Sequence, residues 1–524
     1  MAQITQAGAL NTAALVVPDL YVQIASPQTL ALNGVATDRI GLVGTASWGP
    51  VNQPVVLGSL SDYVAAFGPV IARQYDLGTP LVCAQQQGAA AFVGVRVTDG
   101  TDLAASYAFL YAAGGYPMVL TAVCSGSRGN LISLALSPAS RPSAWKLTLQ
   151  MPGQLAEVFD NIDASAGPPV FWTNLIGAVN NGTSATRGPS ALCVASLGVA
   201  TVTAPVTISN QQLLSGSDGA GAVTSATIVG SDGLSRTGMY ALRGRGCALG
   251  LLADCEDPAQ WTVQSAFGLS EGIYMILVGT SGDSIASAVQ AKQQVGLDSY
   301  STKLMFGDWL FWYDQTNFQT RIVSPQGFAA GCLANQSPEQ SSLNKRLVGI
   351  VGSQKSGLAS SGQALTYSTA ELQTLFEAGI DVICNPAPGG AYWAVRCGHN
   401  SSSNAVISGD SYTRMTNFIA ETLAAGMGGY VGSVINSTLL SNIRATLLGY
   451  LSNLLQQAIL GSLDGSLPYA VVCDGSNNPQ TRTSLGYVQA DVQVRYQGIN
   501  EKFIVNLQGG QGVTVTTASA SGQG

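Results

Sequence analysis

The sequence predicts a multidomain protein of mixed α/β and α+β class. Apolar runs of strand length alternate with amphipathic helical patterns in two stretches of the chain, which is typical of an α/β core. Between these stretches, short alternating runs with frequent Gly, Ser and Pro indicate an inserted β-rich domain. The last part of the chain combines long helical patterns with strict period-two alternation, which predicts a C-terminal α+β domain ending in a β-hairpin.

The N-terminal part of the chain predicts an extended arm followed by the start of the α/β domain. Residues 1–25 are small and polar, with short extended runs on both sides of Pro18 and Asp19, and we expect them to form the arm. The following residues carry the caps and stop signals of two helices between two buried strands. The expected elements are a strand from Arg39 to Thr45, a helix between Ser59 and Gly68, a helix from Thr79 to Gly88 and a strand from Ala91 to Val97.

Changes in pattern set the other predicted domain boundaries. Residues 26–98 and 234–351 together form the α/β domain, and residues 99–233 form the inserted outer domain. Both contain several apolar runs of strand length. Strands are expected at 119–123, 131–136 and 145–150 in the insertion and at 248–253, 274–278 and 304–313 in the α/β domain, with one helix starting near Pro258 and another ending before Gly296.

Residues 352–508 are predicted to form the C-terminal α+β domain. A capping box at Ser368 to Glu371 marks the start of one helix. The second of two later, longer helices carries an apolar stripe, which we interpret as core, with a partner-binding face as the alternative. Strands are expected at 380–384 and 392–396, and the longer helices at 412–425 and 438–460.

The final residues carry the clearest strand pattern. Apolar and polar residues alternate strictly from Val488 to Tyr496, and a second run from Lys502 to Leu507 is predicted to be the antiparallel partner. A Gly-rich spacer then leads to a third short run, Val513 to Thr516, within a predicted C-terminal arm of residues 509–524. This last strand either folds back onto its own hairpin or joins the sheet of a neighbouring subunit, because a two-stranded hairpin offers unpaired edges.

Composition points to self-association. Charged residues make up only 10% of the chain and the mean hydropathy is +0.25. No apolar run approaches the ~20 residues of a membrane span. We therefore expect no membrane insertion, and no signal peptide is recognised. Such a chain is most simply explained if copies of itself cover much of its surface, the alternative being a monomer unusually rich in Gly, Ala and Ser.

Charge and cysteine content argue against further classes. A net charge of -7 and a pI near 4.8, without any cluster of Lys or Arg, argue against a nucleic-acid partner. The nine cysteines are scattered and form no CxxC pair. We expect them to be small buried side chains in a reducing compartment rather than disulfides or metal ligands.

No pattern for catalysis is recognised. The single histidine, His399, lies in a loop-like stretch of Gly, Asn and Ser and is interpreted as a solvated residue. Gly-rich phosphate loops are not found. Asp254 and Glu256, which precede Pro258, are interpreted as acidic caps of a helix N-terminus. We therefore predict that the chain is not an enzyme, with no catalytic, cofactor-binding or metal-binding residues.

Short segments along the chain resemble the contractile tail sheath proteins of phages and of related injection machines. Each segment alone is a weak match, but their common order along almost the whole chain makes the resemblance specific. The segments are Val17 to Gln23 (like P-G-V-Y-V-x-E), Gly41 to Val56, Ser59 to Gly68 (like S-x-x-D-F/Y-x-x-x-F-G), Ser125 to Asn130, Glu157 to Asn161 (like E-x-F-D-N), Leu214 to Gly219, Ser324 to Gly327, and Tyr469 to Asp474 with Asn478 and Pro479.

This resemblance implies a structural function. Sheath subunits polymerise as hexameric rings or a helical assembly around an inner tube, and arms at the chain ends exchange strands with neighbours' C-terminal hairpins. Contraction then drives the tube through the host envelope for genome ejection. The residues that the resemblance assigns to β-strand exchange in this chain are Val16, Val17, Tyr21, Val22, Ile24, Val492, Val494, Phe503, Val505, Val513 and Val515.

The resemblance also implies partners and a location. The partners are other copies of the chain, the inner tail tube protein, and baseplate and tail terminator proteins, and no cofactor is required. The implied location is the contractile tail of a virion, assembled in the host bacterial cytoplasm. The alternatives are the sheath of a phage-derived bacteriocin or secretion-type injection machine, a capsid or other shell protein, and an α/β enzyme with a β insertion.

Overall fold

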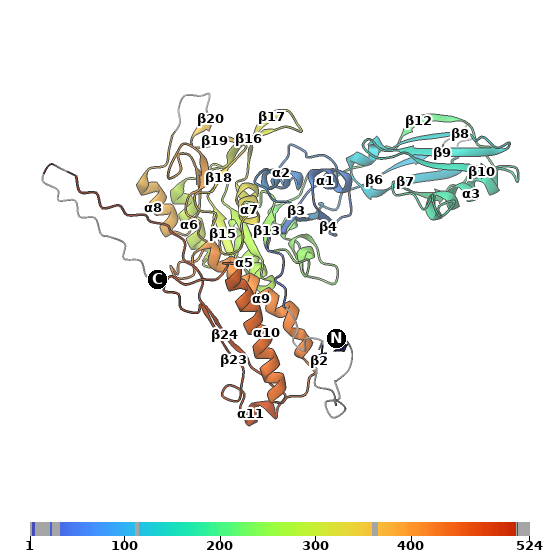
Figure 1. The fold of residues 1–524 in the computed structure, drawn as a ribbon. Helices are drawn as coiled ribbons and strands as arrows, with labels where there is room; N and C mark the ends of the chain where they lie inside the picture. Colours follow the sequence, from blue (N-terminus) through green and yellow to red (C-terminus); the bar gives the residue numbers. More distant parts are fainter. Residues whose placement is uncertain are drawn as a thin grey trace.

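The protein is divided into three parts. The structure is a computed structural model that describes residues 3–5, 21–23, 32–109, 115–358, 365–509 and 511. Figure 1 shows a central α/β body, a lobe of β-strands that projects to one side of it, and a C-terminal unit of long helices and two strands that projects in another direction. The predicted fold class, an α/β core with a β-rich insertion and a C-terminal α+β part, is confirmed.

A six-stranded sheet forms the centre of the body. Its strand order is β15-β14-β13-β3-β5-β4, and all neighbouring pairs are parallel except β4 with β5. Every strand but the edge strand β4 is buried along its whole length, as expected of a parallel sheet covered on both faces. The strands are β3 (Ile40–Gly44), β4 (Pro54–Leu57), β5 (Phe92–Arg96), β13 (Leu249–Leu252), β14 (Tyr274–Val278) and β15 (Thr302–Met305).

The predicted strands at 39–45, 91–97, 248–253 and 274–278 are confirmed as β3, β5, β13 and β14. The single strand expected at 304–313 is wrong, because the chain leaves the central sheet after β15 and resumes as β16 in another sheet. The break falls at Gly307, where a Cβ atom would lie 1.9 Å from the carbonyl oxygen of Thr280. The close approach to this loop explains why an apolar run turns away from the sheet.

Helices of the body begin and end at the predicted signals. The Ser59 side chain caps α1 and Gly68 ends it. Gly296 ends α6 in the left-handed conformation, and Ser368 with Glu371 forms the predicted capping box of α8. The helices are α1 (Leu60–Phe67), α2 (Gly78–Gln86), α4 (Ser225–Val229), α5 (Trp261–Glu271), α6 (Ile285–Val295), α7 (Gln326–Ala334) and α8 (Thr369–Glu377).

Two smaller antiparallel sheets complete the body. Their strand orders are β17-β16-β19-β20 and β18-β22-β21. The strands predicted at 380–384 and 392–396 are confirmed as the shorter β21 and β22. The strands are β16 (Leu310–Asp314), β17 (Gln319–Val323), β18 (Arg346–Leu347), β19 (Ile350–Ser353), β20 (Gly357–Leu358), β21 (Ile383–Cys384) and β22 (Trp393–Val395).

The lobe consists of two antiparallel sheets and a helix. The sheets have the orders β10-β9-β8-β12 and β11-β7-β6, and the predicted strands at 119–123, 131–136 and 145–150 are confirmed as β7, β8 and β9. Helix α3, which the sequence analysis missed, buries Phe171, Trp172 and Leu175 in the core of the lobe. The elements are β6 (Ala104–Ala108), β7 (Met118–Ser125), β8 (Ser133–Pro138), β9 (Ala144–Gln150), β10 (Glu157–Asp163), α3 (Pro168–Asn181), β11 (Cys193–Leu197) and β12 (Ile208–Gln212).

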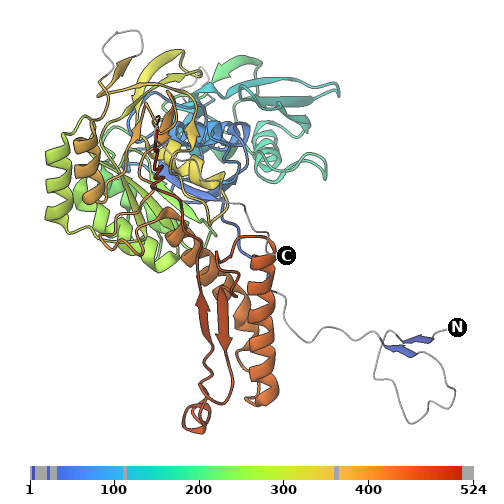
Figure 2. The same cartoon turned by 60° about the vertical axis from the view of Figure 1, so that its left-hand side comes forward.

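The C-terminal unit has its own core. The two predicted long helices are confirmed as α9 and α10, and the apolar stripe of α10 is confirmed as core, because Ile443, Leu447, Leu451 and Leu454 are buried against α9 and the two strands. Both helices run alongside the strands in Figures 1 and 2. The elements are α9 (Asp410–Met427), α10 (Ser437–Gln456), β23 (Tyr469–Val472), α11 (Gln480–Thr483) and β24 (Asp491–Val494).

The predicted final hairpin is wrong in its pairing. β24 lies within the expected strand at 488–496, but its antiparallel partner is β23, not the run at 502–507. Residues 501–509 form no strand in the described chain, and Phe503 and Leu507 are 83% and 89% exposed. The run at 469–472 pairs with β24 instead. Its alternate residues can pack on α10, which the run at 502–507 does not reach.

Domain boundaries stay a prediction, but the cores show how the parts interlock. Leu375 and Ile380, placed by sequence in the C-terminal domain, pack in the same core cluster as β14 of the central sheet. Leu32, placed in the α/β domain, packs with α9 and α10. At the N-terminus, β1 (Gln3–Thr5) pairs in parallel with β2 (Tyr21–Gln23), and this pair lies apart from the body in Figure 2.

Two further expectations concern membranes and cysteines. Within the described residues, none of the helices combines the length and apolar character that a transmembrane segment requires. All nine cysteines are free thiols, and seven of them are buried. The interpretation of the cysteines as buried small side chains is confirmed for these seven, whereas Cys124 and Cys397 are only partly buried.

Candidate assembly surface

The surface that fits the predicted strand exchange is the two-stranded sheet of β23 and β24. The register places Tyr469 opposite Val494 and Val471 opposite Val492. These four side chains share one face and pack in the core of the C-terminal unit. The opposite face carries Gln493 and other exposed residues. Strict alternation in the sequence therefore does produce a half-buried strand at 491–494.

Both outer edges of this sheet lack a strand partner within the described residues. The Arg495 amide donates to the Pro468 carbonyl at 2.7 Å, so the 495–468 pair is a hydrogen-bonded one. Hydrogen-bonded and non-hydrogen-bonded pairs alternate in an antiparallel ladder. The backbone N–H groups of Val492 and Val494 therefore face the open edge of β24, away from β23.

Asparagine side chains hold the connection between the two strands. Asn477 Nδ2 donates to the Val472 carbonyl at 2.8 Å and to Asp491 Oδ2 at 2.9 Å. Asn478 exchanges two hydrogen bonds with the backbone of Gln489, at 2.9 and 2.7 Å. These bonds fix the end of the β23–β24 pair, which gives the sequence segment Asn478-Pro479 a structural role that the sequence analysis did not assign.

The residues predicted for strand exchange fall into three groups in the structure. Val492 and Val494 lie in β24, partly buried against the helices, while Phe503 and Val505 are exposed in the extended chain that follows. Tyr21 and Val22 lie in β2. The remaining predicted residues, which lie outside the described part of the chain, are Val16, Val17, Ile24, Val513 and Val515.

The terminal segment, residues 497–509, is attached to the rest of the protein at its start. Gln497 Nε2 donates to the Ala458 carbonyl at 2.9 Å, and His399 Nε2 lies 2.8 Å from Glu501 Oε1. The interpretation of His399 as a solvated loop residue holds only in part: its side chain is 24% exposed, and it contacts a carboxylate from 102 residues further along. No local sequence pattern could reveal a pairing over this separation.

A buried charge cluster joins the body to the C-terminal unit. Lys303 Nζ on β15 lies 2.6 Å from Asp381 Oδ2 and 3.0 Å from Asp410 Oδ1, and none of the three side chains is more than 1% exposed. Asp410 is the first residue of α9 and also accepts the Tyr274 hydroxyl at 2.6 Å. The direction in which α9 leaves the body is thus set by ionic contacts to the central sheet.

Burial and charge act in opposite directions within this cluster. Burial by itself would lower the pKa of Lys303 and raise that of Asp410. The attraction between the lysine and the carboxylates outweighs burial, so the pKa of Lys303 is raised and the pKa of Asp410 is lowered. Lys303 and Asp410 therefore both stay charged at neutral pH. Lys303, directly before the apolar residues Leu304, Met305 and Phe306, was a signal that sequence reasoning missed.

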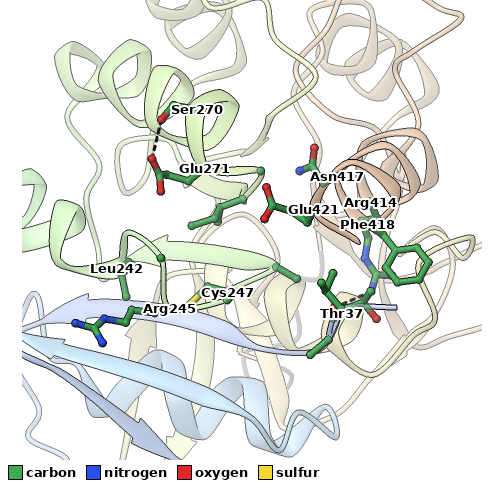
Figure 3. A pocket seen from close by; sticks show the side chains of 17 residues that line it. Thr37, Leu242, Arg245, Cys247, Ser270, Glu271, Arg414, Asn417, Phe418 and Glu421 are labelled. Atoms are coloured by element: carbon green, nitrogen blue, oxygen red, sulfur yellow. Dashed lines mark hydrogen bonds between the residues drawn. The ribbon is translucent and has the colours of Figure 1, made fainter. Parts of the chain in front are cut away.

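A cleft lies beside this joint, between α5 and α9 (Figure 3). Arg414 crosses from α9 to the body and donates to the carbonyls of Ser337 and Thr37 at 2.9 and 3.3 Å. Burial lowers its pKa to about 10. Glu421 and Glu271 line the same cleft, and burial together with the Glu271 charge raises the pKa of Glu421. These contacts place the cleft at the joint between α9 and the body.

The acidic residues near Pro258 do not act as predicted. Asp254 is 8% exposed, has a positive φ of 50° and accepts the backbone N–H of Tyr75 at 3.1 Å, while the side chain that caps the following turn belongs to Asp257. Burial raises the pKa of Asp254 to about 7. Among the described residues, no group of His, Cys, Asp and Glu has an arrangement that could hold a metal ion.

Comparison with known proteins defines the class of the fold. No family model matches the chain, and no curated protein matches it in sequence. Solved structures do match it: the fold is that of contractile tail sheath proteins, as the sequence resemblance led us to expect. At 14% identity or less, these likenesses rest on the fold alone.

Three solved structures illustrate the likeness. The sheath tail protein of Desulfitobacterium hafniense has a TM-score of 0.55 and 14% identity, over 87% of this chain and 93% of its own. The sheath tail protein of Listeria innocua has a TM-score of 0.58 and 14% identity, over 85% and 90%. The sheath of an extracellular contractile injection system, PVC, in its contracted state has a TM-score of 0.53 and 12% identity, over 95% and 98%.

Proposed function

We propose that this chain is the sheath subunit of a contractile tail, most simply that of a phage, and that it polymerises by strand exchange. The observation that carries the proposal is the β23–β24 sheet, which is packed on one face and unpaired at both edges within the described residues. Extended chain with exposed alternating side chains follows directly after it. Together they supply an acceptor and a donor for β-strand addition between copies.

The donor strands come from the two ends of the chain. Residues 502–507 and 513–516 at one end have a short alternating pattern, and 16–17 with 21–24 at the other end are short runs of mainly apolar residues with high β-propensity. Each backbone hydrogen bond in the new ladder contributes about 0.5–1.5 kcal/mol net. A few such bonds per contact link neighbouring subunits while the Gly-rich stretch 509–512 lets the donors change direction.

In this proposal, contraction depends on a rigid joint within each subunit and on extended strands that connect neighbouring subunits. The buried charge cluster and Arg414 hold α9 to the body, so the body and the C-terminal unit move together. Subunits can then rotate past one another while the exchanged strands keep them connected. Many copies sum a small free-energy gain per subunit, which drives an inner tube through the host envelope without any cofactor or enzymatic turnover.

The proposed assembly has defined partners. Other copies of the chain form the rings or helix, the inner tube protein fills the lumen, and baseplate and terminator proteins close the two ends. After assembly in the bacterial cytoplasm, the sheath is part of the virion and serves genome ejection. The alternative is the sheath of a phage-derived injection machine. One of the similar folds supports it, because that fold belongs to an extracellular contractile injection system.

Deletion of residues 509–524 tests the proposal. The described core clusters contain no residue beyond Tyr496, so the truncated chain should stay folded and unfold at the same temperature as the full chain. We expect electron micrographs of the full chain to show tubes or rings and those of the truncated chain to show single subunits. Tubes of normal length from the truncated chain would contradict strand exchange by residues 513–516, the donor that the deletion removes.

A further inference from the structure

The base of the lobe is held to the body through Asp218, which lies between the last strand of the lobe, β12, and α4 of the body. Its carboxylate accepts Arg73 Nη1 of the body at 2.7 Å and the backbone N–H of Ser127 in the lobe at 2.6 Å. Arg96 at the end of β5 donates to the Asp218 carbonyl at 3.1 Å. The lobe meets the body beside α1 in Figure 1. Arg73 is therefore part of the contact that fixes the base of the lobe.

This contact uses only part of the Arg73 guanidinium. Nη1 bonds to Asp218, whereas Nε and Nη2 are buried and have no hydrogen-bond partner among the described residues. Nε and Nη2 form the edge of an arginine that can bind a carboxylate through two parallel hydrogen bonds. Buried donors that lack an acceptor cost free energy. The Arg73 side chain is therefore suited to a second carboxylate.

Asp76 is the carboxyl group that can compete for Arg73. It follows Arg73 by three positions and is fully buried. The backbone N–H and the hydroxyl of Thr79 both donate to Asp76 Oδ2 at 2.8 Å, while Oδ1 accepts a long hydrogen bond of 3.4 Å from the Ile71 backbone. Of the charged groups around Asp76, Arg73 lowers its pKa the most. An ionised Asp76 thus has a weakly bonded oxygen and an arginine nearby.

The two carboxyl groups ionise in different pH ranges. Burial acts to raise the pKa of Asp218, but hydrogen bonds from Ser127 and Arg73 outweigh burial and lower that pKa. Burial raises the pKa of Asp76 from 3.8 to about 6. Of these two groups, only Asp218 is ionised at about pH 5, and it holds Arg73. Above about pH 6 both are ionised, and they compete for the same guanidinium.

The other titratable groups near Asp76 come from three neighbouring elements. Tyr63 on α1 is buried, and burial raises its pKa well above the ordinary value, so it stays neutral. Arg321 on β17 favours an ionised Asp76, but its Nε is bonded to a carboxylate of its own hairpin at 2.8 Å. Asp254 after β13 opposes ionisation of Asp76, and burial raises its own pKa to about 7. Of the two arginines, Arg73 has buried donors that still lack an acceptor.

We propose that Arg73 is a proton-controlled switch at the base of the lobe: it holds Asp218 while Asp76 is protonated, and it moves to Asp76 when that carboxyl loses its proton. Asp76 is fixed to the central sheet, because the backbone at 75–77 bonds to Thr45 at the end of β3 at 2.6 and 2.9 Å. The move therefore takes Arg73 toward the body and away from the lobe. Rising pH loosens the base of the lobe within a single subunit, so the proposal does not rest on the sheath function.

Hydrogen exchange of the dispersed, full-length subunit tests the proposal. The backbone amides at 127 and 128 bond to the Asp218 carboxylate and to the Ser47 carbonyl of the body, so they report the contact between lobe and body. Their protection factors, corrected for the intrinsic effect of pH on exchange, should fall by about tenfold between pH 5 and pH 7.5. This factor corresponds to a coupling of one pKa unit.

Two variants identify the carboxyl group that causes the fall. Asp76→Asn should abolish it, because the side chain keeps an oxygen for Thr79 and no longer titrates. Asp254→Asn removes another buried carboxyl that titrates in the same range and should retain the fall. Constant protection in the unmodified chain, or an equal fall in Asp76→Asn, would overturn the proposal.

Double-mutant cycles locate Arg73 at each pH. The coupling between Arg73→Gln and Asp218→Asn should be about tenfold in the unfolding equilibrium constant at pH 5 and smaller at pH 7.5. The coupling between Arg73→Gln and Asp76→Asn should change in the opposite direction. Couplings that do not vary with pH would overturn the switch. Failure of the unmodified chain to form tubes would instead count against the sheath function and leave these measurements unaffected.

Discussion

The central six-stranded sheet and the two-stranded β23–β24 sheet differ in how far their strands are buried and paired. The central six-stranded sheet is buried along nearly every strand, and its one internal lysine is neutralised by two carboxylates. The β23–β24 sheet has two strands, one buried face and two unpaired edges in the described residues. In the first sheet, β14, β13, β3 and β5 each have a strand partner on both sides, while each strand of the second sheet has a partner on one side only within the described residues. The comparison separates a part of the fold whose strands are largely paired within the chain from the part that we propose to assemble.

The largest expected effect comes from a change in the buried charge cluster around Lys303. Lys303→Met leaves two buried carboxylates without their partner, and such a loss costs about 3–5 kcal/mol of unfolding free energy. Chemical denaturation measures this directly. Lys502→Met, at an exposed position, is the control and should change stability by less than about 0.5 kcal/mol. Equal stabilities for the two variants would show that the charge cluster does not hold the joint.

A second prediction concerns pH and the buried carboxyls of the body. Burial raises the pKa of Asp76 to about 6 and that of Asp254 to about 7, from 3.8. The folded state therefore keeps protons that the unfolded chain loses first, and stability should fall as pH rises from about 4 to about 7. Each carboxyl contributes at most about 1.4 kcal/mol per pH unit within its window.

The matching variant is Asp254→Asn, which keeps an oxygen for the Tyr75 amide and removes the titration. It should flatten the loss of stability between pH 4 and pH 7 and should raise the unfolding free energy at pH 7. Asp257→Asn, in an exposed turn, serves as the control. An unchanged pH dependence in Asp254→Asn would show that this carboxyl does not titrate in that window.

A smaller effect on stability, but a decisive one on assembly, is expected at the open edge. Val492→Pro removes an N–H group that faces the edge of β24, and it spares the ladder to β23. In addition to the effect of losing the valine side chain, each added strand loses the backbone hydrogen bond from position 492. Such a bond contributes about 0.5–1.5 kcal/mol net. Val492→Ala loses the same side-chain packing but keeps the donor. Sedimentation should find tubes with Val492→Ala only.

The smallest effect is expected at the start of the terminal segment. Glu501→Gln removes the charge opposite His399, and because this pair is partly exposed it is worth roughly 0.2–1 kcal/mol. Amides at 497–509 should exchange slightly faster while the rest of the chain is unchanged. Lys502→Gln is the neighbouring control. Equal exchange in both variants would indicate that the extended backbone, not the contact between Glu501 and His399, positions the segment.

Local signals predicted most of the fold. The Ser59 and Ser368 caps and the apolar runs of β3 and β14 depend on neighbours in sequence, and the structure confirms them. Helix α3 was missed because its apolar spacing lies among many short runs of strand length. The likeness to sheath proteins was also available from sequence, through short collinear segments rather than overall identity.

The candidate site was less predictable because its contacts are non-local. The alternating run at 502–507 looks as suitable a partner for β24 as Tyr469–Val472 does, and only packing on α10 distinguishes them. The contact of His399 with Glu501 and that of Lys303 with Asp410 each span about a hundred residues of chain, at separations of 102 and 107. Such pairs appear only when the fold brings distant segments together.

The most direct test of the account is a three-dimensional reconstruction of assembled tubes by electron cryo-microscopy. The account predicts a strand from another copy beside the open edge of β24, hydrogen-bonded to the amides of Val492 and Val494. A tube in which this edge faces solvent, or is paired with a strand from the same copy, would contradict it.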